Sequence, residues 1–244
     1  MDLKNKRVLV TGGGSGIGLG IALALAREGC RVVIAGRNQA KLDQAASRFS
    51  GQPVIMAQAC NVADRGEVDR LFATLADQNL LPLDILVNSA GVNVARRKMV
   101  DLDPHDWEQM MAINVNGAYY CMHAALPGMR QQGEGLIVNI ASIAGKCALT
   151  LAGPAYCASK FAMSALGLAV GLEDRANGVR VTNIYPGEVN TPILDQRPVP
   201  VPDEKKLQMV QPEDIAACVV TIARLPTRVV VPELVITPLY QEYA

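Results

Sequence analysis

The sequence predicts an α/β fold in which one doubly wound parallel sheet of about seven strands is flanked by helices. Short runs rich in β-branched residues alternate with longer helical patterns, and such alternation produces right-handed crossovers between parallel strands. The strand runs are continuously apolar, as expected where a sheet is buried on both faces. Because no internal repeat, low-complexity segment or linker interrupts this pattern, residues 1–244 are predicted to form a single domain.

The expected strands follow the apolar runs in chain order: 6–12, 31–36, 53–60, 83–91, 135–142, 179–187 and 228–237. Pro232 falls inside the last of them, and because proline cannot donate to a ladder, that strand is expected at an edge of the sheet. Residues 92–103 and a proline-rich segment that runs to Gln211 are expected to be loops.

Helices are expected between the strands, at 15–28, after Asn38, at 64–77, at 104–132, at 154–177 and from Pro212 onward. Their starts carry known signals: a capping Asn38, a capping-box pattern at 64–67, and a proline at the first helical position at 104, 154 and 212. Asn177 and Gly178 form a stop signal for the helix that precedes them.

The composition excludes several function classes. The formal net charge is zero, so the chain lacks the basic footprint of a nucleic-acid binder. Six cysteines occur without a C-x-x-C pair, which predicts buried thiols in a reducing compartment. The charged start leads into a strand rather than a signal peptide, and no apolar run approaches the ~20 residues of a membrane span. We therefore expect a cytoplasmic protein. With only His105 and His123 present, neither a metal site nor a Ser-His-Asp triad is expected.

A glycine-rich stretch, TGGGSGIG at 11–18, joins the first expected strand to the first helix. Glycines at such a turn let the backbone approach a pyrophosphate, and the helix N-terminus behind them offers unpaired N–H groups. Ile17 and Leu19 stand at glycine positions of the G-x-G-x-x-G pattern, and no Lys-Ser/Thr pair follows to make a P-loop. The position after the first strand favours a nucleotide site over an ordinary glycine-rich turn.

The second expected strand ends in AGRN at 35–38, where an NAD site usually carries an acid that bonds the ribose 2′-hydroxyl. Arg37 stands there instead, and a guanidinium suits bidentate pairing with a 2′-phosphate. The sequence therefore favours NADP(H), with NAD(H) as the alternative if Arg37 is only a solvated loop residue.

Tyr156 and Lys160 are four residues apart in an apolar helix and so share one face. A phenol has a pKa near 10, and acid–base work near neutrality needs a depression of roughly 3 units, which a nearby ammonium favours. Ser142 ends the fifth expected strand and Asn88 ends the fourth, at the edge where open parallel sheets bind ligands. Asn114, among apolar residues, is either a satisfied core amide or part of the same site.

Together these motifs identify a resemblance to the short-chain dehydrogenase/reductase family over essentially the whole chain. The matching segments, in order, are TGGGSGIG, NSAG at 88–91, NV at 114–115, Ser142, YCASK at 156–160 and YPGEVNT at 185–191. The resemblance implies a Rossmann-type fold that is both dinucleotide-binding and catalytic. It also implies that Tyr156 exchanges a proton with the substrate oxygen, Lys160 lowers the pKa of that phenol and holds the nicotinamide ribose, Ser142 bonds the carbonyl oxygen, and Asn114 fixes a water.

The resemblance further implies a cofactor-binding set. Val189 and Thr191 would lie near the nicotinamide carboxamide, and Asn61 with Val62 would flank the adenine. The full expected set is Gly12, Ser15, Gly16, Ile17, Gly18, Arg37, Asn61, Val62, Asn88, Ala90, Gly91, Tyr156, Lys160, Pro186, Gly187, Val189 and Thr191.

The chain departs from the family pattern at a few positions. Asn61 stands where Asp is usual and Ser89 where a second Asn is common, and both keep hydrogen-bonding ability. Ser142 and Tyr156 are one residue further apart than is commonest. The C-terminal region lacks the T-G-Q…D-G-G pattern of many 3-oxoacyl-carrier-protein reductases and more closely resembles bacterial hydroxy-acid and general carbonyl reductases.

The predicted activity is hydride transfer between NADP(H) and a small-molecule carbonyl/alcohol pair. The alternatives are an NAD(H)-dependent alcohol dehydrogenase, a 3-oxoacyl-thioester reductase and a non-catalytic cofactor-sensing protein. The pocket is expected from segments 92–100, 143–150 and 188–210. Arg96, Arg97 and Lys98 could attract an anion, although a solvated basic loop is the favoured interpretation. Glu188 could meet a polar or cationic substrate, or pair with a local lysine.

Residues 155–172 and the segment 104–132 are apolar nearly all round, whereas a surface helix usually keeps a polar face. One face of each can pack on the sheet, which leaves the other without a partner. The resemblance implies that these two helices pair across a two-fold axis, so a homodimer or homotetramer is predicted.

Overall fold

The computed structural model describes residues 1–242 and contains one parallel sheet of seven strands in the order β3-β2-β1-β4-β5-β6-β7. The strands are β1 (Arg7–Thr11), β2 (Arg31–Gly36), β3 (Met56–Ala59), β4 (Ile85–Asn88), β5 (Gly135–Ile140), β6 (Val179–Pro186) and β7 (Glu233–Ile236). The strand order reverses direction between β1 and β4, so the loops after these two strands diverge and leave a crevice at the carboxyl edge. The predicted doubly wound parallel sheet is confirmed.

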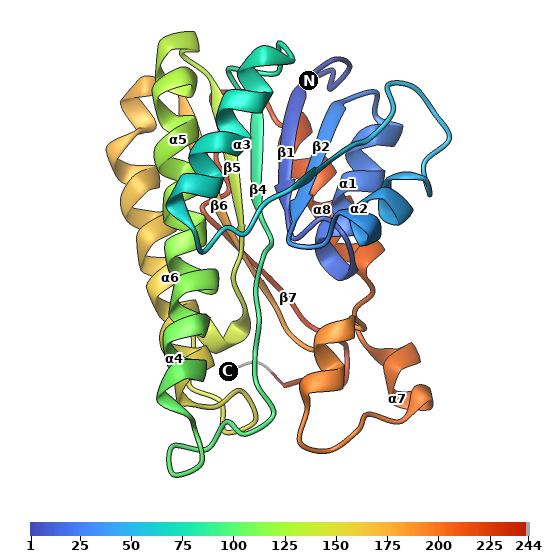
Figure 1. Ribbon diagram of the computed structural model, residues 1–244, viewed down its shortest axis with the longest axis vertical. Coiled ribbons are helices and arrows are strands. Elements are labelled where there is room, and N and C mark those ends of the chain that lie inside the picture. The colour runs from blue at the N-terminus through green and yellow to red at the C-terminus, as the bar shows by residue number, and fades with distance from the viewer. Residues whose placement is uncertain (243–244) are drawn as a thin grey trace.

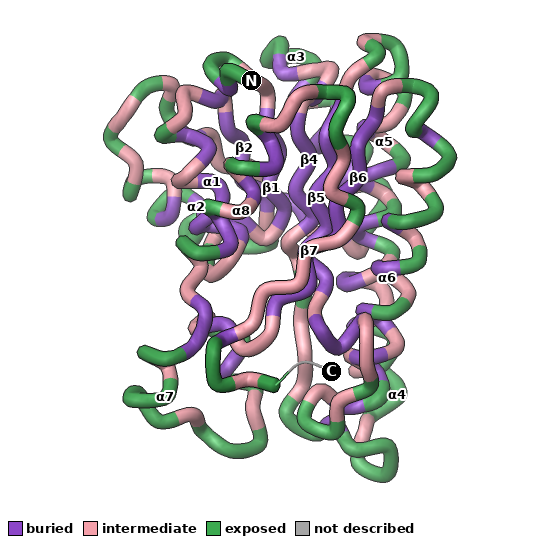
Figure 2. The backbone as a smooth tube through the Cα atoms, turned by 180° about the vertical axis from the view of Figure 1, so that it is seen from behind, coloured by how far each residue is buried: buried purple, intermediate pink, exposed green. Residues whose placement is uncertain are grey.

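Helices cover both faces of the sheet (Figure 1). On one face pack α1 (Gly16–Arg27), α2 (Gln39–Ala46) and α8 (Pro212–Arg224); on the other pack α3 (Arg65–Asp77), α5 (Gly117–Gln132) and α6 (Pro154–Glu173). Val8 and Val10 contribute to the first core layer and Leu9 to the second, which explains why the strands are apolar without alternation. Figure 2 shows the buried strands at the centre, with exposed backbone concentrated in the helices and loops around them.

The helix expected at 104–132 is instead made of three pieces. It begins as α4 (Pro104–Met111), continues as a π-helical turn, η1 (Ala112–Asn116), and resumes as α5. In the π turn the Gly117 N–H bonds to the Ala112 carbonyl five residues back. The extra residue shifts the side chains of this turn relative to an uninterrupted α-helix, and Asn114 lies within it.

Most of the predicted helix starts are confirmed in atomic detail. The Asn38 side chain accepts from Lys41 N at 3.0 Å, and prolines 104, 154 and 212 open α4, α6 and α8. The capping box at 64–67 forms only in part. Asp64 accepts from Glu67 N at 2.9 Å, but the Glu67 carboxylate accepts from Asn61 N at 2.7 Å instead of reaching back to Asp64.

Several segments differ from the sequence prediction, and α6 ends at Glu173 rather than at 177. β3 begins at Met56 rather than at 53, after a cis Gln52–Pro53 peptide bond. β7 begins at Glu233, so Pro232 precedes the strand rather than lying inside it, although β7 does form an edge. The proline-rich segment is not one loop, because it contains the 3₁₀ turn η4 (Pro192–Gln196) and the helix α7 (Asp203–Gln208).

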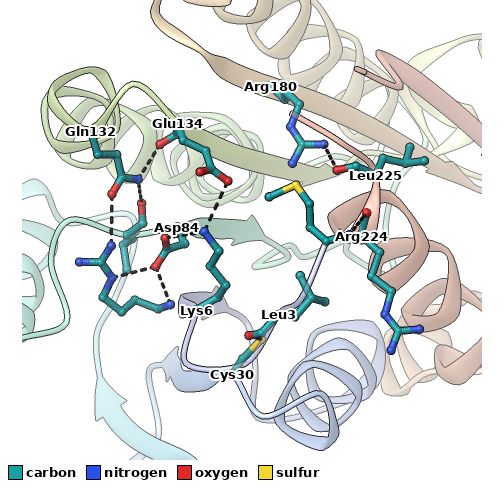
Figure 3. Close-up of polar contacts among 12 residues, drawn as sticks. Leu3, Lys6, Cys30, Asp84, Gln132, Glu134, Arg180, Arg224 and Leu225 are labelled. Carbon is teal, nitrogen blue, oxygen red and sulfur yellow. Dashed lines mark hydrogen bonds and ion pairs between the residues drawn. The ribbon is translucent and has the colours of Figure 1, made fainter. Parts of the chain in front are cut away.

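A charged cluster joins the amino ends of the central strands, at the edge opposite the crevice (Figure 3). Asp84 accepts from Arg7 Nε at 2.7 Å and from Lys6 Nζ at 3.2 Å, and Lys6 also pairs with Glu134 at 3.4 Å. Burial raises the pKa of Asp84, but the hydrogen bonds from Arg7 and the charge of Lys6 outweigh it and hold that pKa below its usual value. Ion pairs therefore stabilise the amino edge of the sheet, whereas the carboxyl edge is open to a ligand.

By length and composition, α6 is long and apolar enough to cross a membrane, which differs from the sequence expectation that no segment approaches this length. In the fold it lies against the sheet, and Ser159, Lys160 and Ser164 on it are buried. Its apolar character therefore serves the second core layer and the site described next.

Candidate active site

A cavity of about 830 Å³ opens at the carboxyl edge of the sheet, within the usual size range of small-molecule sites. Of the residues predicted from the sequence, the following line it: Gly12, Ser15, Gly16, Ile17, Gly18, Arg37, Asn61, Val62, Ala90, Gly91, Ser142, Tyr156, Lys160, Pro186, Gly187, Val189 and Thr191. Asn88 and Asn114 do not line it. Residues from nearly the whole length of the chain thus converge on one cavity because the parallel strands end at the same edge.

Asn88 points into the sheet instead of the cavity. Its Nδ2 donates to Asn139 Oδ1 at 2.9 Å, Asn139 Nδ2 donates to Asn183 Oδ1 at 3.0 Å, and Asn183 Nδ2 donates to the Ser164 carbonyl at 2.9 Å. These three asparagines are direct neighbours in the strand register and form an amide ladder beneath α6. Asn139 and Asn183 were not singled out from the sequence; Asn139 is the last residue but one of β5, and Asn183 lies within β6. The ladder connects α6, the helix that carries Tyr156, to the strands β4, β5 and β6.

Lys160 is 4% exposed, and its ammonium donates to the Ile140 carbonyl at 2.8 Å. No carboxylate of residues 1–242 pairs with it, and burial lowers the pKa of Lys160 to about 8. A Cβ at Gly91 would lie 3.5 Å from Lys160 Nζ and 3.6 Å from Asn114 Oδ1. The missing side chain at Gly91 therefore keeps open the space in front of the ammonium.

Tyr156 stands one turn before Lys160, whose Nζ is 5.6 Å from the centre of the phenol ring. Burial raises the pKa of Tyr156 to about 12, and the hydrogen bond with Ser142 and the charge of Arg97 oppose this only in part. The sequence expectation that Lys160 depresses this pKa is therefore not met in the ligand-free protein. The ammonium is hydrogen-bonded to the Ile140 carbonyl and does not compensate for the burial of the phenol. The Ser142 hydroxyl itself accepts from Ala144 N at 3.1 Å.

Asn114 is fully buried and has three hydrogen bonds. Its Oδ1 accepts from Val92 N at 2.8 Å, and its Nδ2 donates to the Val92 carbonyl and to Ser159 Oγ, each at 3.0 Å. Ser159 Oγ in turn donates to the Tyr156 carbonyl at 2.9 Å. Asn114 thus holds the loop that follows β4 against α6, the helix that carries Tyr156 and Lys160.

The glycine turn before α1 is shaped for close approach. Gly12 has φ +66°, and a Cβ on Gly18 would lie 2.4 Å from the Gly12 carbonyl oxygen, so a larger residue cannot be placed there without moving the turn. Ser15 is the N-cap of α1, and its side chain makes no capping hydrogen bond. The N–H groups of the first helical turn therefore remain available to an anion.

The end of the cavity beside the β2–α2 loop, far from Tyr156, carries positive charge. Arg37 and Lys41 both line it and are exposed, and Lys41 was not identified from the sequence. Glu188 is the one carboxylate among the cavity-lining residues described, and it belongs to the opposite end. Lys41 could have been found from its place three residues after Asn38, in the first turn of α2 behind the Arg37 loop.

Glu188 pairs locally, as one of the sequence alternatives proposed. Its carboxylate lies 2.7 Å from Arg197 Nη1 and 3.2 Å from Lys205 Nζ, and Tyr240 OH donates to it at 2.6 Å. The Gln241 side chain accepts from Glu188 N at 2.8 Å. Burial raises the pKa of Glu188, but its hydrogen bonds with Tyr240, Arg197 and Lys205 outweigh it and lower that pKa. This network holds α7 and residues 238–241 against the PGEVNT segment.

Known proteins share this architecture. Residues 6–199 match the short chain dehydrogenase family, so the chain belongs to that family of oxidoreductases. It is 38% identical to an uncharacterized oxidoreductase of Staphylococcus aureus (strain MW2) over 97% of this chain and 98% of that protein. The closed form of serine dehydrogenase complexed with NADP+ superposes with a TM-score of 0.87 at 30% identity, over 97% of this chain and 96% of that one. A variant of actinorhodin polyketide ketoreductase with NADPH has a TM-score of 0.87 at 29% identity, over 96% of both chains.

The residues present fit a nicotinamide dinucleotide. The turn at Gly12 and Gly18 leaves room for a pyrophosphate beside the free N–H groups of α1, and the gap at Gly91 leaves room beside Lys160. Among residues 1–242 there is no group of three or more His, Cys, Asp or Glu side chains that could hold a metal ion.

Proposed function

We propose that this enzyme transfers a hydride between NADP(H) and a small-molecule carbonyl/alcohol pair, with residues 1–244 acting as one dinucleotide-binding and catalytic domain. The observation that carries the proposal is a single cavity that joins Ser142, Tyr156 and Lys160 to the uncapped start of α1 and to two cations. Solved structures similar to this chain carry NADP+ or NADPH, which supports the choice of cofactor.

The protein groups divide the work as follows. Ser142 holds the substrate oxygen by a hydrogen bond, and Tyr156 OH gives that oxygen its proton during carbonyl reduction. Because burial raises the pKa of Tyr156 to about 12, the phenol is protonated at neutral pH and suited to donate. A bound nicotinamide cofactor supplies or accepts the hydride at the reacting carbon.

Lys160 has a pKa of about 8 and is charged at neutral pH. Its ammonium faces the open space at Gly91, where it would hold the nicotinamide ribose and favour loss of the Tyr156 proton. Asn114 orients this region through Val92 and Ser159, and it would also fix the water that links Lys160 to solvent. Asn88 acts by positioning, through the amide ladder.

Arg37 and Lys41 at the far end of the cavity, with no carboxylate beside them in the described lining, support a 2′-phosphate and hence NADP(H) over NAD(H). The six cysteines are free thiols, which supports a reducing, cytoplasmic compartment. Exposed apolar side chains on α5 and α6 support a homodimer or homotetramer.

The test is a spectrophotometric screen of NADPH and NADH oxidation against a panel of aldehydes, ketones, oxo acids and 3-oxoacyl thioesters. Turnover of one carbonyl class with NADPH, abolished in Tyr156→Phe, is the expected result. NADPH binding without turnover of any carbonyl would contradict the proposal and favour a cofactor-sensing protein.

A further inference from the structure

The charges around the cavity are unbalanced. Among the residues that the structure describes, five cations line it, namely Arg37, Lys41, Arg97, Lys160 and Arg197, against the single carboxylate of Glu188. Arg37 and Lys41 lie at the end assigned to the cofactor phosphate, and Lys160 belongs to the catalytic centre. Arg97 and Arg197 remain at the substrate end, and their charges are not required by any step described so far.

Glu188 neutralises only one of these two arginines. Arg197 Nη1 lies 2.7 Å from the Glu188 carboxylate, which also pairs with Lys205. Arg97 has no carboxylate within ion-pair distance among residues 1–242, although it is only 8% exposed. A buried guanidinium without a counter-ion is costly, because charge removed from water needs compensation. A ligand that carries negative charge would supply it.

Arg97 is held in a fixed position beside the catalytic helix. Nε donates to the Val94 carbonyl at 2.8 Å, Nη1 donates to the Leu151 carbonyl at 2.9 Å, and Nη2 donates to the Gln196 carbonyl. A Cβ at Gly153, the N-cap of α6, would lie 2.8 Å from Arg97 Cβ, so the arginine stem packs where the Tyr156 helix begins. Arg97 thereby connects two of the segments expected to form the substrate pocket, 92–100 and 188–210, with Leu151, which directly follows the third.

Two of the Arg97 guanidinium N–H groups have no hydrogen-bond partner among residues 1–242. A guanidinium carries five N–H groups, and three of them are used in the bonds to carbonyls. One N–H therefore remains on each terminal nitrogen, and two such donors can pair with the two oxygens of a carboxylate. The same cavity must admit a dinucleotide as well, so the second molecule is small.

We infer that Arg97 binds the carboxylate of the substrate, and that the substrate is a short oxo acid on the reduction side and the corresponding hydroxy acid on the oxidation side. The inference rests on the proposed function and deepens it. Arg97 is a specificity-determining residue, because it contacts the substrate at a group that does not itself react.

An arginine with a purely structural role could also donate to three backbone carbonyls, so these contacts alone do not distinguish a structural role from ligand binding. Arg180 is such an arginine: it is 7% exposed, and Nη1 donates to the carbonyls of Ile222, Leu225 and Val229. Arg180, however, borders a cavity of only about 10 Å³, too small for more than about one water, whereas Arg97 borders the large cavity that contains Tyr156. The difference between the two sites is space for a ligand.

The experiment compares charged and neutral substrates of matched shape. NADPH oxidation is followed with glyoxylate, pyruvate, acetoacetate and 4-oxobutanoate, each beside its methyl ester, in wild type, Arg97→Gln, Arg97→Lys and Arg96→Gln. Arg96 is exposed and does not line the cavity, so Arg96→Gln is the matched control. Thermal unfolding and NADPH fluorescence report whether each variant is folded and binds cofactor.

Wild type is expected to prefer at least one acid over its ester by roughly 10- to 150-fold in kcat/KM, the usual range for one charge-assisted contact. Arg97→Gln should lose that preference because kcat/KM falls more for the acid than for its ester, mainly through KM; Arg97→Lys should restore part of the preference, and Arg96→Gln should match wild type. Esters reduced as well as acids by wild type, or an acid preference retained by Arg97→Gln, would overturn the inference and leave the proposed function intact. Absence of turnover with every carbonyl would overturn the proposed function itself.

A second measurement does not depend on the variant. With wild type and a methyl ester as substrate, propionate and butyrate should inhibit competitively, and propionamide and butyramide should be at least tenfold weaker. Equal inhibition by acids and amides would contradict a carboxylate site even if Arg97→Gln fails to fold.

Discussion

The ammonium nitrogen of Lys160 lies 5.6 Å from the centre of the Tyr156 ring and is hydrogen-bonded to the Ile140 carbonyl, not to the phenol. Lys160 is buried and Tyr156 is partly buried, and burial moves the two pKa values in opposite directions, to about 12 for Tyr156 and about 8 for Lys160. In each residue burial penalises the charged form. Placing this pair in a buried site therefore lowers the stability of the ligand-free protein.

We expect Lys160→Met to stabilise the ligand-free protein at pH 7. A depression of the lysine pKa from 10.5 to about 8 corresponds to a cost on the order of 3 kcal/mol for the charged form. The folded pKa is below the unfolded one, so between pH 8 and 10.5 the unfolded chain binds more protons and wild-type stability rises with pH relative to the variant. Urea unfolding of both proteins at several pH values measures this. A difference that does not shrink over that window would contradict the burial argument, and cofactor binding should be weaker in the variant.

We expect Tyr156→Phe to reduce turnover by 10²–10⁴-fold, the usual contribution of a general acid. Cofactor affinity should remain near the wild-type value because only the phenolic oxygen is removed. Tyr119→Phe, an exposed tyrosine on α5, is the matched control and should leave turnover unchanged. Retention of more than about a tenth of the wild-type rate in Tyr156→Phe would show that another group donates the proton.

The fold could be predicted from the sequence because parallel strands buried on both faces leave long apolar runs. The π turn could not. Ile113 and Val115 around Asn114 suit an α-helix and a π-helix equally, and a single extra residue in a turn leaves no periodic signature. Likewise α7 escaped prediction because DEKKLQ is a short polar segment after prolines, with no apolar face to reveal it.

Most of the cavity lining was predictable, since its motifs are contiguous in sequence. What escaped depended on contacts across the fold. The amide ladder needs the register of β4, β5 and β6, which sets Asn88, Asn139 and Asn183 side by side. Burial raises the pKa of Tyr156, and the Lys160 ammonium that was expected to lower it is hydrogen-bonded to the Ile140 carbonyl. Sequence spacing alone puts the lysine near the phenol and cannot reveal this competitor.

We expect the wild-type enzyme to prefer NADPH over NADH in kcat/KM by roughly 10- to 150-fold, from one charge-assisted contact to the 2′-phosphate. Arg37→Ile should remove most of that preference, and Lys41→Gln a smaller part, because both cations line the same end of the cavity. Combining Gly36→Asp with Arg37→Ile should turn the preference toward NADH. A Cβ at Gly36 would lie 3.5 Å from Leu42 Cδ2, an ordinary contact, so the aspartate can be accommodated. Equal efficiency with both cofactors in wild type would mean that Arg37 is only a solvated residue.

We expect a homodimer or homotetramer at micromolar concentration. Tyr119 on α5 and Phe161, Leu168 and Leu172 on α6 are 47%, 43%, 39% and 69% exposed, an apolar surface that a monomer would leave in water. Sedimentation velocity of Leu168→Glu with Leu172→Glu should show a smaller species than wild type. Leu207→Glu on α7, where Leu207 is 82% exposed, is the control and should not change assembly. A wild-type monomer would refute the prediction.

We expect Gly167→Ala to destabilise the protein although alanine favours helices by about 1 kcal/mol over glycine. A Cβ at Gly167 would lie 2.1 Å from Asn183 Oδ1 and 2.6 Å from Asn139 Nδ2, so the amide ladder would have to move apart. Overpacking typically costs 1–3 kcal/mol, and a broken buried hydrogen bond adds a similar amount.

Gly171→Ala, one turn further along α6, is the matched control: its Cβ would lie 3.2 Å from Val181 Cβ, with no polar group to displace. Because the ladder sets the height of α6 above the sheet, Gly167→Ala should also lower kcat, while Gly171→Ala should cost less in both unfolding free energy and turnover. Equal stability of the two variants would mean that the ladder tolerates displacement and does not position the Tyr156 helix.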